Sequence, residues 1–239
     1  MDFIDVLLLI HVISGVVALV SAFIAVGVAK GAKVHRKVGV VFFYSMLVVG
    51  ITAIPVTFVR PNPFLFFIAL FSFYMAFAGY RRGRKRHVDD TVDRVAAWLM
   101  LAFGVVMIGY GVFMVAAGDE LGWALTSFGA LGLTFGVEDA VKARRTVAHA
   151  DRVRVHLSRM LGGTIATITA VMVQQVSPLV QNPLAEVALW LGPTVVLVPV
   201  IFLWNFRIIK TGKYRLISGA QPVKPIDSGS PSPETQRSF

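Results

Sequence analysis

The 239-residue sequence contains no cysteine. Disulfide bonds, iron–sulfur clusters, thiolate metal sites, cysteine nucleophiles and covalently attached c-type haem are therefore excluded. Charge is also scarce, because only 15% of the residues are charged, whereas soluble domains carry about 25%. Neither a Walker phosphate-binding loop nor a Gly-x-Ser-x-Gly nucleophile motif is present, so nothing supports ATP-driven transport or serine hydrolysis. We predict no catalytic residue.

Hydrophobic residues make up 56% of the chain and are collected in long blocks, with a mean hydropathy of +0.73. A helix needs about 20 mostly apolar residues to cross the ~30 Å hydrocarbon core of a bilayer. We therefore predict an all-α, polytopic integral membrane protein with seven transmembrane helices within residues 1–213. The seven blocks are Phe3–Val28, Val38–Val59, Phe64–Tyr80, Val95–Ala117, Leu121–Val141, Val155–Val176 and Ala185–Ile208.

Two parts of the chain differ from the other blocks. The fifth block is less apolar than the rest at its end, where Glu138 and Asp139 lie. Residues 214–239 are rich in Pro, Ser and Gly, a composition typical of disorder, and we predict a disordered cytoplasmic tail there.

The positive charges are distributed asymmetrically. Of the 23 Lys and Arg residues, all except Arg60 lie on one side of the seven blocks, in connectors or near the ends of the blocks. The positive-inside rule then predicts a multi-pass protein of the cell membrane with its N-terminus outside and its C-terminus in the cytoplasm. The net charge of +10 is accounted for by this orientation and by contact with anionic lipids. We therefore expect no nucleic-acid partner.

Ionisable residues at membrane depth are the first candidates for function. His11 lies inside the first block, and two interpretations stay open for it: a functional group, or a hydrogen bond to a neighbouring helix. Small residues follow His11 at helical spacing and predict close helix packing; they are Ser14, Gly15, Ala18, Ser21, Ala22 and Ala25.

His35 and His156 form the more informative pair. Each lies at the predicted cytoplasmic start of a span, the second and the sixth, so the two should lie at similar depth. One ligand or metal ion would reach both if these spans are close together. The sixth span also carries a polar stripe, which indicates either a cavity lining or hydrogen bonds between helices; it comprises His156, Arg159 or Met160, Gly163, Thr167, Ala170 and Gln174.

Two carboxylates end the fifth block. Glu138 has a predicted partner in Lys142, four residues on and in the favourable order. Asp139 has no such local partner, and three interpretations stay open: an ion pair with Arg36, an ion pair with Arg159, or a hydrogen bond that orients His35 or His156.

Two absences within the predicted spans narrow the function further. No Lys lies in the middle of a span, which excludes a retinal Schiff base of the rhodopsin kind. No His-x-x-x-His occurs, which argues against seven-helix zinc amidases and receptors of the ceramidase type.

Several short motifs together resemble an uncharacterised family of bacterial and archaeal predicted membrane proteins, grouped under a domain of unknown function. The resemblance covers nearly all of residues 3–210, and it implies no activity. The sixth helix of that family often ends in Asn, where this chain has Gln174 and Gln175. The matching residues are His11, Gly15, Ala18 and Leu19; His35, Arg36 and Gly39; Phe71 and Tyr74; Asp139; His156, Leu157, Arg159, Met160 and Gly162; and Trp190, Leu191, Pro193 and Thr194.

Three functions follow as hypotheses. The first is binding or transport of a small solute or anionic ligand through a cytoplasmic-side polar site. The second is a membrane redox protein that holds b-type haem or a divalent metal ion between His35 and His156. The third is a membrane scaffold or assembly factor. The candidate ligand-binding residues are His11, His35, Arg36, Asp139, His156 and Arg159.

Overall fold

A computed structural model describes residues 2–84, 91–142 and 149–211, and these residues form helices and turns with no strand. Each of the seven hydrophobic blocks coincides with a helix, so the all-helical prediction is confirmed. The predicted tail, residues 214–239, lies outside the described residues. The helices are α1 (Phe3–Gly27), α2 (Lys33–Val59), α3 (Pro63–Arg84), α4 (Thr91–Ala116), α5 (Leu121–Lys142), α6 (His149–Val176) and α7 (Pro183–Thr211), with a short 3-10 helix, η1 (Ser177–Leu179).

Six of these helices are long and apolar enough to cross a membrane, and α5 is not among them. Two acidic residues, Glu138 and Asp139, and four glycines lower the hydropathy of α5. Its glycines and Asp139 are buried against other helices. A helix that contacts protein on several sides does not need an apolar surface, which explains its composition.

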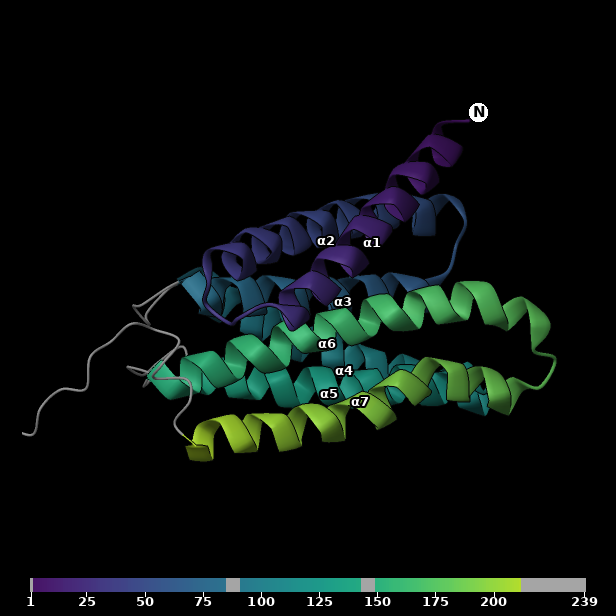
Figure 1. Cartoon of the computed structure of the whole chain (residues 1–239). Helices are drawn as coiled ribbons and strands as arrows, with labels where there is room; N and C mark the ends of the chain where they lie inside the picture. Colours follow the sequence, from purple (N-terminus) through teal and green to yellow (C-terminus); the bar gives the residue numbers. More distant parts are fainter. Residues whose placement is uncertain (1, 85–90, 143–148, 212–239) are drawn as a thin grey trace, which may run out of the picture.

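The helices pack as an elongated bundle whose middle layer is α3 and α6 (Figure 1). The α1–α2 pair lies on one side of this layer, and α4, α5 and α7 lie on the other (Figure 1). α1 starts at one end of the bundle and α7 finishes at the opposite end (Figure 1). α7 continues as one helix through Pro193 and Pro199.

The outer surface of the bundle is apolar. Large hydrophobic side chains are exposed along α1, α4 and α7, among them Phe23, Phe113 and Phe202. Soluble monomers rarely expose contiguous apolar patches of this kind, because water penalises them. Together with the six long apolar helices, this surface fits a hydrocarbon surrounding.

A seam of small residues joins α4 to α5. A Cβ atom built on Gly129 would lie 3.0 Å from the carbonyl oxygen of Gly104, and one built on Gly122 would collide with the carbonyl oxygen of Gly111. The two main chains therefore touch, as in membrane helix pairs with small interfacial residues. Facing residues recur every seven positions, a period that gives a left-handed wrap; the three pairs are Ala97 with Gly136, Gly104 with Gly129, and Gly111 with Gly122.

We predict that Gly122→Ala destabilises the bundle. The added methyl meets the main chain of Gly111, and such overpacking costs about 1–3 kcal/mol. The measurement is the thermal unfolding midpoint of the detergent-purified protein. Gly109→Ala is the matched control, because a Cβ atom there meets no atom within 4 Å. Equal midpoints for the two variants would contradict this packing.

Candidate functional site

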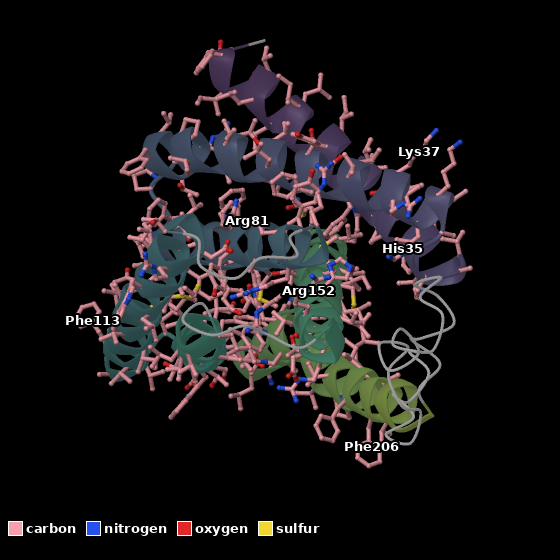
Figure 2. All side chains as sticks on the ribbon, turned by 90° about the vertical axis from the view of Figure 1, so that its left-hand side faces the viewer. His35, Lys37, Arg81, Phe113, Arg152 and Phe206 are labelled. Carbon is pink, nitrogen blue, oxygen red and sulfur yellow. The ribbon has the colours of Figure 1, made fainter. Side chains whose placement is uncertain are left out.

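The site lies at one end of the bundle, where α1, α3 and α5 end and α2, α4 and α6 begin. We call it the basic end, because cationic side chains gather there. Figure 2 looks onto this end, with Lys37 pointing outward beside His35 and with Arg81 and Arg152 nearer the middle. The exposed cations on the first turn of α2 are Lys33, Arg36 and Lys37.

The structure brings His35 and His156 together at the basic end. His35 lies in the first turn of α2 and His156 in the second turn of α6. Their ring centres are 6.4 Å apart, with an angle of 81° between the ring planes. The two helices are therefore close enough for one small group to contact both rings.

Hydrogen bonds to the main chain fix the tautomer of both rings. Nδ1 of His35 lies 3.1 Å from the carbonyl oxygen of Ala25, and Nδ1 of His156 lies 2.7 Å from that of Gly79. A carbonyl oxygen only accepts, so Nδ1 carries the proton in both rings. Each Nε2 then has a free lone pair, and neither Nε2 has a hydrogen-bond partner among the described residues.

Two glycines of α3 set the position of His156. A Cβ atom on Gly83 would lie 2.7 Å from Nδ1 of His156, and one on Gly79 would lie 2.9 Å from Sδ of Met160. The Gly79-x-x-x-Gly83 spacing thus lets α6 approach the α3 main chain, as small-x-x-x-small motifs do in membranes. This role was not predicted, although the spacing in the sequence is its signal.

The connector between α1 and α2 holds the end of α1 beside His35. Nζ of Lys30 donates to the carbonyl oxygens of Ala25 (3.0 Å) and Val26 (2.5 Å). Burial lowers the pKa of the Lys30 ammonium. The carbonyl oxygen of Ala25 therefore accepts from both Lys30 and His35, which ties the start of α2 to α1.

Arg159 is the most deeply buried charge of the described residues, with its side chain 0% exposed. Its Nε donates to Oδ2 of Asp139 (3.2 Å), and its Nη2 donates to Oε2 of Glu138 (2.9 Å) and to the carbonyl oxygen of Phe135 (3.3 Å). The guanidinium also lies 4.1 Å from the centre of the Phe135 ring. Its charge is therefore compensated within the protein, as burial requires.

Asp139 is the centre of this cluster. Its Oδ2 accepts from the hydroxyl of Tyr74 at 2.6 Å as well as from Arg159. Of the partners proposed for Asp139, Arg159 is the one observed, and Arg36 is exposed on α2 instead. The alternative that Asp139 orients a histidine is wrong for Nδ1, because main-chain carbonyls occupy that atom in both rings.

The predicted pair of Glu138 with Lys142 is confirmed at 2.6 Å. Glu138 also accepts from Arg154 at 3.1 Å and from Arg159 at 2.9 Å. The cluster thus joins α3, α5 and α6 through charge-assisted hydrogen bonds, which are stronger than neutral ones. The sequence shows Tyr74 only as a motif position, and its hydrogen bond to Asp139 was not predicted.

The remaining candidates lie away from this cluster. Nδ1 of His11 lies 3.1 Å from Oγ1 of Thr52, which itself donates to the carbonyl oxygen of Val48, so His11 donates to Thr52 across the α1–α2 interface. Thr52 and His35 are 17 residues apart in one helix, hence roughly 25 Å. His11 is therefore not part of the His35–His156 pair.

Only part of the polar stripe on α6 is buried. Thr167 donates to the carbonyl oxygen of Gly163 at 2.9 Å and packs against Met46 of α2. Ala170 and Gln174 are exposed. Where the stripe is buried, it contributes to helix packing, and the hydroxyl of Thr167 is hydrogen-bonded within α6.

We predict that Arg159→Met destabilises the protein by about 3–5 kcal/mol, because it leaves the buried carboxylate of Asp139 without its cation. Adding Asp139→Asn to this variant should recover part of the loss. Arg154→Met is the control: Arg154 is half-exposed, so its loss should cost less than about 1 kcal/mol. The unfolding midpoint of each variant is measured in the same detergent, and additive effects of the two buried changes would contradict the coupling.

Comparisons of the chain with protein-family models, curated proteins and solved structures find no match. The resemblance to an uncharacterised membrane family therefore stays a prediction from motifs. Function has to be argued from the geometry of the site itself.

Proposed function

We propose that the chain is a seven-span membrane protein whose basic end faces the cytoplasm. The exposed apolar surface and the six long apolar helices support a membrane location. α5 is proposed as the seventh span because it packs against α4 along its length and exposes apolar side chains, among them Trp123 and Val137. An odd number of spans also fits the start of α1 and the end of α7 at opposite ends (Figure 1).

We further propose that the protein binds a redox-active metal between His35 and His156, with b-type haem iron as the group that fits best. The observation that carries this proposal is the state of the two imidazoles. Each donates Nδ1–H to a main-chain carbonyl, which is the usual arrangement of metal-ligating histidines, and each keeps an unpaired Nε2.

The separation of the rings is compatible with one metal held by both imidazoles. With nitrogen–metal distances of about 2.0–2.1 Å, two imidazoles on one metal place their ring centres roughly 5–6.5 Å apart. The observed 6.4 Å lies within this range.

Haem would need few ligands from the protein. His35 and His156 would hold its iron, because the porphyrin would supply four further nitrogens. Among the described residues, no group of three or more His, Cys, Asp or Glu side chains forms a second candidate metal site. Exposed cations lie beside His35 at the start of α2 and would pair with the propionates of the haem. They are Lys33, Arg36 and Lys37.

The test is an absorption spectrum of the purified protein, oxidised and then dithionite-reduced, with elemental analysis of the same sample. Expression uses a host supplied with haem precursor and trace metals. We expect a Soret band with α and β bands that sharpen on reduction, and iron in stoichiometric amount. His35→Ala and His156→Ala should each abolish the bands, whereas His11→Ala should keep them, since His11 lies far from the pair.

A second variant separates ligation from general damage. Gly83→Ala should shift the His156 ring and weaken the haem bands, because the methyl would overlap the imidazole. Gly39→Ala, where a Cβ atom meets nothing within 4 Å, should leave them unchanged. A folded, colourless, metal-free wild-type protein from a haem-replete host would overturn the proposal.

Binding of a small anionic ligand is the second candidate. The first turn of α2 has no acidic residue and no side-chain N-cap hydrogen bond, and it exposes Lys33, Arg36 and Lys37. Free N–H groups at a helix N-terminus attract anions. Thermal stabilisation by inorganic phosphate or a dicarboxylate in a metal-free sample, lost in Arg36→Ala, would support this candidate. If neither haem nor an anion binds, the scaffold hypothesis is left.

A further inference from the structure

A small hollow lies between α3, α4 and α5 at the basic end, on a different face of α3 from the one that contacts His156. Its polar lining consists of Tyr74, Arg82, Asp93 and Asp139. Tyr74 and Arg82 are eight residues apart on one helix, so the hollow runs about 12 Å along α3 towards the basic end.

One buried polar atom in this hollow lacks a direct partner. Asp139 is 4% exposed; its Oδ2 is bonded twice, but its Oδ1 is buried without a hydrogen bond among the described residues. Arg82 is 8% exposed, lines the same hollow and carries N–H donors. A buried carboxylate oxygen without a donor is costly, so a group that donates to Oδ1 would be stabilised in the hollow.

The charge of the site indicates a neutral ligand. Asp93 is already paired with Arg81, and Arg159 is shared between Asp139 and Glu138. Arg82 and Asp139 face the hollow with opposite charges, and Asp139 is also paired with Arg159. A carboxylate oxygen repels an anion, so the group beside Oδ1 has to donate a hydrogen bond. A neutral ligand that donates to Oδ1 of Asp139 and accepts from Arg82 fits both sides of the hollow.

The volume of the hollow sets the size of that ligand. Its volume is about 10 Å³, which is close to the space that one water molecule requires. Water both accepts and donates, and it is the usual partner of buried polar groups that the protein leaves unsatisfied.

We propose that this hollow is a binding site for one ordered water molecule, which bridges the guanidinium of Arg82 to Oδ1 of Asp139. The water completes the hydrogen bonding of Asp139 and connects the end of α3 to the Arg159 cluster. It also places water within about one helical turn of the ends of α3 and α5. This inference does not depend on the proposed haem site.

The test is X-ray radiolytic footprinting of the wild-type protein in detergent, read by mass spectrometry. Hydroxyl radicals formed from a bound water oxidise the side chains next to it, whether or not those side chains reach the solvent. Tyr74 is the reporter, and Phe71 is its matched control. Both lie on α3 and are equally buried, at 7% and 6% exposed, but Phe71 does not line the hollow and packs against Phe128 instead.

We expect Tyr74 to be oxidised several-fold faster than Phe71 in the wild-type protein. Arg82→Met, which keeps the length of the side chain and removes its donors, should reduce oxidation of Tyr74, whereas Arg82→Lys should preserve it. Equal oxidation of Tyr74 and Phe71 in the wild type would overturn the proposal without any variant. Unchanged oxidation of Tyr74 in a folded Arg82→Met protein would overturn the role of Arg82 in holding the water.

Discussion

The burial of one cation, Arg159, constrains the arrangement of the helices around it. A guanidinium that is 0% exposed is tolerated only where its charge and its N–H groups are matched. The matching groups are Asp139, Glu138 and the Phe135 carbonyl, all on α5. This requirement fixes both the depth and the rotation of α6 against α5. Tyr74 then extends the constraint to α3 through Asp139.

The position of His156 follows from this constraint and from two glycines. His156 precedes Arg159 by less than one turn of α6, so the rotation that buries Arg159 against α5 turns the imidazole towards α3. Gly79 and Gly83 let the ring rest on the α3 main chain. The α1–α2 pair supplies His35, held by the carbonyl oxygen of Ala25 at the end of α1. The ion pairs of Arg159 and the close glycine contacts together bring the two imidazoles to the basic end.

Features encoded by local spacing could be predicted from the sequence. The hydrophobic blocks gave all the helices, and the four-residue spacing gave the pair of Glu138 with Lys142. The similar depth of His35 and His156 followed from their places at the starts of two helices, and the structure adds that the two helix starts are close. These predictions needed only the rise and the period of an α-helix.

Features that depend on how helices rotate against one another could not be predicted. The sequence left Asp139 with three possible partners, because each would need a different rotation of α2, α5 and α6. The hydrogen bond from Tyr74, the place of Arg82 beside the hollow and the facing glycines of α4 and α5 were not predicted for the same reason. The composition of the fifth block also follows from helix contacts, because the glycines and Asp139 that lower the apolarity of α5 are buried against other helices.

The central claim is that α2 and α6 bring His35 and His156 to one site, and cysteine cross-linking tests it most directly. The natural chain has no cysteine, so a His35→Cys, His156→Cys protein carries only the two thiols under test. We predict that a short bifunctional thiol reagent links the two peptides within one chain, as detected by mass spectrometry. A His11→Cys, His35→Cys protein should give no link. If both thiols of the first protein react singly and are never linked, the two helix starts do not meet and the proposed site does not exist.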